Sequence, residues 1–189
     1  RRGAVPASGA PLYCGIGGPL RRLAPGADSR FPPAPTAFQE LFARLGEPWE
    51  HVQLFSLHGD SAFLPWRSML RSPLAAIYGD AKRSAQRLAA ELIACFPDAA
   101  SRCAAAGCDL GLPEETVVRG TLGELAENPA ADRSLSVLAL LPGGMDAFPE
   151  LPLGLNDDNY LRGKNMITHP EVRAIAVAKL RPAPGGGGP

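Results

Sequence analysis

The sequence lacks three features that would assign a protein to a class at once. It has no excess charge, because 19 lysine and arginine residues balance 19 aspartate and glutamate residues, so charge gives no reason to expect nucleic acid or a membrane as a partner. It has no long apolar run, since its longest largely apolar stretch, residues 135–141, is too short to span a membrane. It also starts with Arg1-Arg2-Gly3, without methionine or a signal-peptide pattern. We therefore expect a fragment of a longer protein.

Cysteine is scarce as well. The chain has four: Cys14, Cys95, Cys103 and Cys108. Their spacing matches neither a zinc knuckle nor a CxxC redox pair, and a chain of this length forms a core without disulfides. We therefore expect reduced thiols in a cytoplasmic protein. The three histidines are scattered along the sequence, so no metal site is expected.

Short periodic segments make up most of the chain, separated by its 21 glycines and 20 prolines. Their periods predict helices over 19–23, 36–45, 65–70, 81–96, 121–128 and 168–181. They predict strands over 51–57, 74–78, 103–106, 116–118 and 135–141. Because strands alternate with helices at this spacing, we predict an α/β domain over residues 51–141.

Two of these helices have the clearest signals. The helix 36–45 has Thr36 as a good N-cap and Gly46 as a C-terminal stop. The helix 81–96 carries a buried stripe and, opposite it, a basic, polar face. The stripe consists of Leu88, Leu92 and Ile93, and the basic face of Lys82, Arg83, Gln86 and Arg87.

The last part of the chain has a different character. Residues 142–165 are rich in glycine and proline without a sustained period, which predicts a linker. Thr168 and Glu171 form a capping-box pattern and open a helix within residues 166–182. Only a glycine- and proline-rich tail, 183–189, follows. We expect the helix to be the opening of a truncated second domain and the tail to be flexible.

Several segments resemble one known family, in order along the chain. Residues 8–17 (SGAPLYCGIG) and 34–49 (APTAFQELFARLGEPW) resemble two cofactor-lining segments of the tetrapyrrole methyltransferases. Residues 56–59 (SLHG) and 109–125 (DLGLPEETVVRGTLGEL) resemble the branch that methylates precorrins at ring carbon C5. Residues 157–160 (DDNY) and 168–174 (THPEVRA) resemble the entry to a fused domain that methylates C15 and decarboxylates.

This resemblance implies a fold and a cofactor. The implied fold is α/β and tetrapyrrole methylase-like, with two α/β domains and S-adenosylmethionine in the cleft between them. Residues 1–46 would be the C-terminal part of an incomplete first domain, and 51–141 the second domain. The family's glycine-rich loops on either side of this stretch are absent from the sequence.

The resemblance also implies site residues. It gives Ser8, Gly9, Ala10, Tyr13, Thr36, Ala37 and Asp109 as cofactor-binding residues. Tyr78 and Gly79 complete the predicted set, because the carboxyl end of a strand is a usual ligand position in an open α/β sheet. His58, at a predicted strand end, could contact substrate or accept a proton. Simpler readings stay open beside each of these: a turn at 8–13, an N-cap at Thr36, a strand end at Gly79 and a structural histidine at His58.

The implied activity is S-adenosylmethionine-dependent C-methylation of a precorrin at C5, with C15 methylation and decarboxylation by the fused domain, in cobalamin biosynthesis. A precorrin is then the small-molecule partner, and a homo-oligomer is expected. Two alternatives remain at this point. One is a non-catalytic remnant that serves as a binding or oligomerisation module, which Ala10, in place of the family's aspartate, favours. The other is a methyltransferase acting on a different tetrapyrrole.

Overall fold

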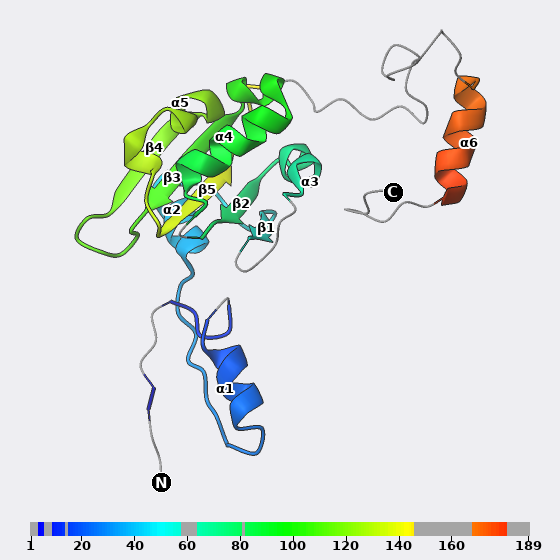
Figure 1. The fold of residues 1–189 in the computed structure, drawn as a ribbon. Helices are drawn as coiled ribbons and strands as arrows, with labels where there is room; N and C mark the ends of the chain where they lie inside the picture. Colours follow the sequence, from blue (N-terminus) through cyan, green and yellow to red (C-terminus); the bar gives the residue numbers. More distant parts are fainter. Residues whose placement is uncertain are drawn as a thin grey trace. The chain divides into compact units, whose positions relative to one another are not determined.

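The computed structural model describes residues 4–5, 9–13, 15–57, 64–80, 82–145 and 168–180. The chain divides into two compact units, Arg1–Asp146 and Ala147–Pro189, and Figure 1 shows the elements of each. The first unit holds all the described strands. In the second unit, the described residues form one helix, α6 (Pro170–Leu180).

A five-stranded mixed sheet forms the centre of the first unit. Its spatial order is β1-β2-β5-β3-β4, and β1 and β2 are parallel, whereas the other neighbouring pairs are antiparallel. The strands are β1 (Gln53–Ser56), β2 (Ala75–Tyr78), β3 (Cys103–Cys108), β4 (Thr116–Thr121) and β5 (Ser136–Leu140). The predicted α/β class is confirmed.

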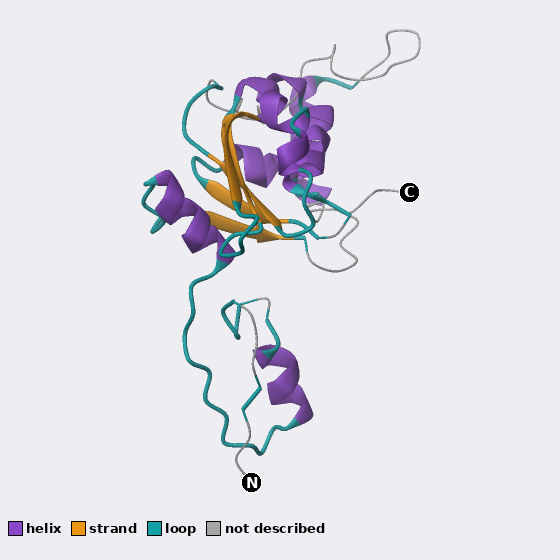
Figure 2. Ribbon diagram, turned by 90° about the vertical axis from the view of Figure 1, so that its left-hand side faces the viewer, coloured by secondary structure: helices purple, strands orange, loops and turns teal. Residues whose placement is uncertain are grey.

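Helices cover both faces of this sheet, as Figure 2 shows. Helix α2 packs on one face, against β5 and β3, and α4 and α5 pack on the other. The helices of this unit are α1 (Gly17–Leu23), α2 (Ala37–Leu45), α3 (Trp66–Arg71), α4 (Ala85–Cys95) and α5 (Leu122–Ala126), with short 3-10 turns at Pro97–Ser101 and Pro129–Ala131. The predicted division of the chain near residue 46 stays a prediction, and α2, just before it, packs on the sheet that follows.

Alternation along the strands divides the core into two layers. Val137 and Ala139 of β5 join the cluster around α2, together with Phe38 and Phe42 from that helix. The intervening strand residues, such as Leu138, point to the opposite face because side chains alternate along a strand. Alanine fills much of β2 and β3, so neither layer of helices is held away from the sheet by bulky side chains.

The predicted helix over 81–96 begins later, at Ala85. The Asp80 carboxylate accepts the backbone N–H groups of Lys82 and Arg83 at 2.8 and 2.9 Å, which forms a turn. Ser84 then caps the helix by accepting the N–H of Arg87 at 3.3 Å. Lys82 and Arg83 therefore precede the helix, and the prediction that they share its polar face was wrong.

The buried stripe of that helix is confirmed for Leu88 and Leu92, which are fully buried. Ile93, the third predicted member, is only partly buried.

The strands predicted over 103–106 and 116–118 were too short. β3 continues to Cys108 because Gly107 pairs with Val117 on one side and Val137 on the other. β4 continues to Thr121, opposite Cys103. Glycine is a weak strand former, so local propensity predicts that the strand ends before Gly107. In the structure, hydrogen bonding to a strand on each side keeps Gly107 and Cys108 in β3.

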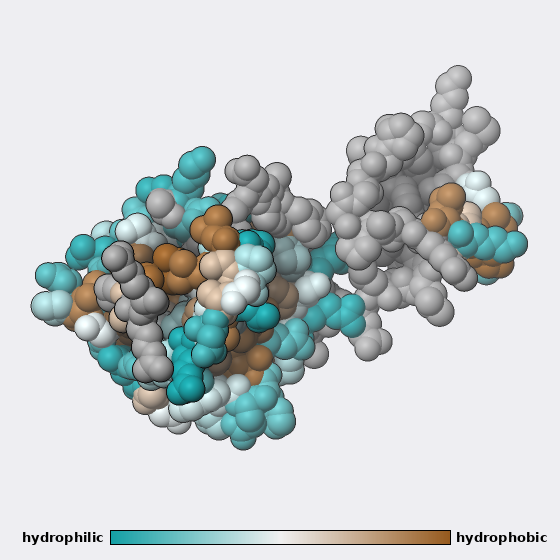
Figure 3. Space-filling model, turned by 90° about the horizontal axis from the view of Figure 1, so that it is seen from below, coloured by the Kyte–Doolittle hydropathy of each residue, from teal (hydrophilic) through white to brown (hydrophobic). Residues whose placement is uncertain are grey.

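Helix α6 forms within the predicted range 166–182. Its apolar side chains Val172 and Ile175 are more than half exposed, and Figure 3 shows brown surface on this helix at the right-hand end of the view. The predicted linker lies largely outside the described residues, and the tail 183–189 lies wholly outside them. None of the described helices is long and apolar enough to cross a membrane.

Candidate functional site

The ends of three strands meet at one edge of the sheet. β2 and β3 finish there and β5 starts there, because β5 is antiparallel to both. A pocket of about 500 Å³ opens at this edge, which is within the size range of small-molecule sites. It is lined by the ends of these strands, the start of α2, the turn after β3 and the N-terminal loop: Gly9, Ala10, Tyr13, Gly15, Pro35, Thr36, Ala37, Glu40, Tyr78, Gly79, Gly107, Asp109, Leu110, Gly111, Leu112, Ser134, Leu135, Ser136 and Val137.

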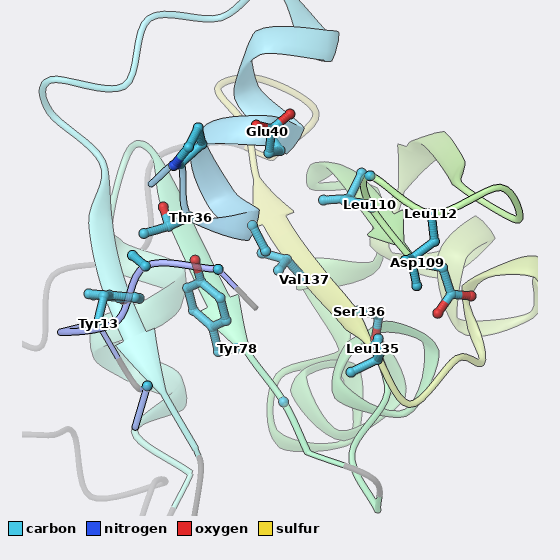
Figure 4. A pocket seen from close by; sticks show the side chains of 18 of the residues that line it. Tyr13, Thr36, Glu40, Tyr78, Asp109, Leu110, Leu112, Leu135, Ser136 and Val137 are labelled. Carbon is cyan, nitrogen blue, oxygen red and sulfur yellow. The ribbon is translucent and has the colours of Figure 1, made fainter. Parts of the chain in front are cut away.

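Aromatic side chains form one wall of the pocket. The ring of Tyr13 lies 5.4 Å from that of Tyr78 and 6.3 Å from that of Phe38, measured between centroids. The Tyr78 hydroxyl accepts the backbone N–H of Phe38 at 2.9 Å, so the end of β2 is tied to the start of α2. Figure 4 shows the two tyrosines on one side of the pocket, Asp109 and the neighbouring leucines on the other, and Val137 between them.

The start of α2 brings backbone amides to the same pocket. Thr36 is the N-cap, as predicted, and Gly46 ends the helix with a positive φ of 70°. The N–H and hydroxyl of Thr36 both donate to Gln39 Oε1, at 2.9 and 3.0 Å. The N–H of Ala37, the first helical residue, has no partner among the described residues. A free amide at a helix start suits an anionic group of a ligand.

The opposite wall is a tight turn that follows β3. Asp109 has a φ of 50° and Gly111 a φ of 80°, and a left-handed backbone at a residue other than glycine costs about 1 kcal/mol. The N–H of Asp109 donates to the carbonyl of Leu135 at 2.8 Å, which ties the turn to the start of β5. This conformation holds the Asp109 side chain at the pocket.

The charge of the lining is one-sided. Among the described residues that line the pocket, Glu40 and Asp109 are acidic and none is lysine or arginine. Glu40 already pairs with Arg44 at 2.5 Å, whereas Asp109 has no side-chain hydrogen bond or ion pair within the described part of the chain. The pocket therefore favours a ligand with positive charge over a polycarboxylate.

Two other kinds of chemistry find no support in the described residues. Burial raises the pKa of the Cys108 thiol to about 11, so this cysteine stays protonated near neutral pH and supplies no thiolate. No group of three or more histidine, cysteine, aspartate or glutamate side chains in the described part of the chain could hold a metal ion.

The structure gathers most of the predicted cofactor-binding residues. Eight of the nine line this pocket: Gly9, Ala10, Tyr13, Thr36, Ala37, Tyr78, Gly79 and Asp109. Ser8 and His58 lie outside the described residues. The binding and catalytic roles of all ten predicted site residues stay predictions.

Sequence reasoning missed the contribution of β5. Its first residues, with Ser134 and Leu135 before it, complete the pocket floor. A buried strand of this kind gives no local signal, because only its place between β2 and β3 brings its start to the pocket.

Comparisons with known proteins agree on the fold. The sequence profile of the Tetrapyrrole (Corrin/Porphyrin) Methylases matches residues 1–126. No protein of curated function matches the sequence. Among solved structures, uroporphyrin-III C-methyltransferase from Thermus thermophilus, complexed with S-adenosyl homocysteine, matches with 23% identity and a TM-score of 0.52 over 70% of this chain and 62% of that one.

Two further structures are similar at lower identity. The methyltransferase CobJ matches with 18% identity and a TM-score of 0.54, over 71% of this chain and 62% of that one. Diphthine synthase matches with 16% identity and a TM-score of 0.55, over 71% of this chain and 57% of that one. The chain thus spans about 60% of the length of the structures that it matches.

Proposed function

Because this chain belongs to the tetrapyrrole methylase family, whose members use S-adenosylmethionine, we propose that its pocket binds this cofactor and that the protein of which it is a part methylates a tetrapyrrole. The observation that carries the proposal is the pocket itself. Eight residues that are distant in sequence, six predicted from family motifs and two from a strand end, line one cavity of about 500 Å³.

The chemistry of the lining supports this ligand. S-adenosylmethionine carries a positive sulfonium and a positive ammonium group beside one carboxylate. The acidic lining, with Asp109 at the pocket and without a side-chain partner, complements the positive groups. The Ala37 amide at the start of α2 suits the carboxylate. A tetrapyrrole with several carboxylates fits this lining poorly, so the ring would bind outside the pocket.

The bound cofactor supplies an electrophilic methyl group on sulfur. The chain's own residues have to orient it and exclude water, and positioning accounts for most of the rate in such a reaction. The Tyr13 and Tyr78 rings form an apolar wall, and the hydrogen bond from Phe38 to Tyr78 fixes that wall to α2. His58 is proposed as the residue that accepts a proton after methylation.

The finer proposal concerns the acceptor. The SLHG and DLGLPEE segments support a precorrin methylated at C5 (the activity of a precorrin-6Y C5,15-methyltransferase), with C15 methylation and decarboxylation by a further domain. The fold alone does not choose the acceptor, since diphthine synthase shares it. The cytoplasmic location and a homo-oligomeric assembly also stay proposals.

A binding measurement tests the pocket. Asp109→Asn removes the carboxylate charge but keeps the shape, and asparagine tolerates the left-handed backbone at this position. We expect the affinity for S-adenosylmethionine, measured by calorimetry, to fall about tenfold, as is typical when a hydrogen bond to a charged group is lost. Asp98→Asn, at an exposed aspartate outside the pocket, should leave the affinity unchanged. If the wild type, Asp109→Asn and Asp98→Asn bind S-adenosylmethionine with equal affinity, Asp109 does not contact the cofactor and the cofactor binds elsewhere.

An acceptor assay tests the finer proposal. The protein is incubated with S-adenosylmethionine labelled at its methyl group, and with precorrin-6Y or uroporphyrinogen III as acceptor. Label in precorrin-6Y at C5 is the expected result. Label only in uroporphyrinogen III would identify a different tetrapyrrole methyltransferase. Tight cofactor binding without transfer to either ring would instead favour the non-catalytic binding module.

A further inference from the structure

A three-residue ionic bridge spans from α2 to the turn that follows β3. Arg44 donates from Nη1 to Glu40 Oε2 at 2.5 Å, and from Nε and Nη2 to the two carboxylate oxygens of Glu115, the second at 2.7 Å. Glu40 and Arg44 are one turn apart on α2, whereas Glu115 lies 71 positions further along the chain. The bridge therefore links two elements that only the fold brings together.

The far end of this bridge holds the pocket wall. Glu115 Oε2 also accepts the backbone N–H of Gly111 at 2.6 Å. Gly111 lines the pocket, as do Asp109 and Leu112 on either side of it. The φ of 50° at Asp109 is a conformation that residues other than glycine seldom adopt, whereas Gly111 adopts its φ of 80° readily. Contacts from outside the turn therefore help to hold Asp109 in this conformation.

The near end also reaches the pocket, because Glu40 is one of its lining residues. Arg44 contributes no lining itself. It neutralises Glu40 and orients Glu115 with a two-pronged contact, a geometry that arginine provides and lysine does not. The electrostatic effect is visible in the pKa of Glu115, which the Arg44 hydrogen bond and the Gly111 N–H lower.

We propose that Arg44 is a positioning residue for cofactor binding: through Glu115 it holds the turn Asp109–Leu112 in the shape that the ligand meets. This inference rests on the proposed function, since it assigns a role within the same pocket. Arg44 lies outside the pocket, and its loss should lower the affinity for the ligand more than it lowers the stability of the fold.

The expected effects separate ligand binding from stability. The side chains of Arg44 and Glu115 are 30% and 25% exposed, and ion pairs of this kind add little to stability. Arg44→Met should therefore shift the melting temperature by less than about 3 °C. The affinity for S-adenosylhomocysteine should fall about tenfold. Without the bridge, the turn Asp109–Leu112 is less ordered in the free protein, and ordering it when the ligand binds costs free energy. The Gly111 amide should exchange with solvent faster.

The experiment is a titration of the full chain with S-adenosylhomocysteine, with hydrogen exchange measured on the free protein. Arg44→Lys keeps the charge without the two-pronged contact and should recover part of the affinity. The double variant Arg44→Met/Glu115→Gln should bind no more weakly than the weaker single variant, because both changes break one bridge. Arg87→Met, which removes the ion pair of Arg87 with Asp132 at 3.3 Å outside the pocket, is the matched control and should bind as the wild type does.

The outcomes distinguish the two proposals. If the wild type binds and Arg44→Met binds equally well, the role of Arg44 is overturned and the proposed function stands. If Arg44→Met and Arg87→Met weaken binding to the same extent, the effect is general and the role of Arg44 is again overturned. If the wild type binds no S-adenosylhomocysteine, the proposed function fails and the role of Arg44 in binding fails with it.

Discussion

Replacing Arg102 by methionine is expected to lower the free energy of unfolding by about 3–5 kcal/mol, because several hydrogen bonds from one buried, charged donor are lost together and each buried acceptor left unpaired costs about 1–3 kcal/mol. Arg102 is only 7% exposed and has no carboxylate partner among the described residues. Its guanidinium instead donates to four backbone carbonyl groups, those of Leu70, Ser72, Pro73 and Leu141, at 2.8 to 3.4 Å.

These carbonyls explain the size of the effect. They come from the end of α3, the loop before β2 and the residue after β5, so one side chain joins three segments. Burial lowers the pKa of the Arg102 guanidinium, yet arginine remains charged in proteins. Methionine fills similar space but leaves the carbonyls without donors, which is where most of the cost arises.

Urea denaturation measures this prediction. Arg102→Lys keeps the charge but has no planar fork, so it should lie between the wild type and Arg102→Met. A loss below about 1 kcal/mol for Arg102→Met, the range for an exposed polar contact, would show that water replaces the guanidinium at these carbonyls.

The second large effect is expected from Gly79→Ala. A Cβ atom on Gly79 would lie 1.8 Å from the carbonyl oxygen of Arg83 and 3.2 Å from Leu88 Cδ1. Because the nearer atom belongs to the backbone, it cannot rotate away, and the turn between β2 and α4 has to shift. We expect a loss of about 3 kcal/mol in stability, and with it a melting temperature lower by about 10 °C.

This turn also borders the pocket, so cofactor affinity should fall together with stability. Gly26→Ala is the matched control, because no atom lies within 4 Å of a Cβ built at Gly26 and its φ is not positive. The control should be neutral or slightly stabilising, since alanine restricts the unfolded chain. Thermal melts of both variants measure the loss of stability, and S-adenosylhomocysteine titrations measure the loss of affinity. A Gly79→Ala protein that melts and binds as Gly26→Ala does would mean that the turn relaxes without cost.

Much of the candidate site could be predicted from residues close together in sequence. Thr36 was identifiable as an N-cap because capping depends on a few neighbouring residues. The family motifs predicted Tyr13 and Asp109 as cofactor-binding residues, and the end of a strand predicted Tyr78. Their meeting in one pocket was not readable from any of the segments alone. It depends on β5 running antiparallel between β2 and β3.

The sequence alone therefore determined features that arise within a few residues: the cap at Thr36 and the stop at Gly46, the alternation of strands and helices, and the order of the motifs. The tertiary structure decided the strand order, the burial of Arg102 and the bridge from Arg44 to Glu115. The physical reason is that the alternating pattern within a strand determines which of its faces is buried, but not which strands lie next to it in the sheet. Contacts between groups far apart in sequence exist only once the sheet has set which segments are adjacent.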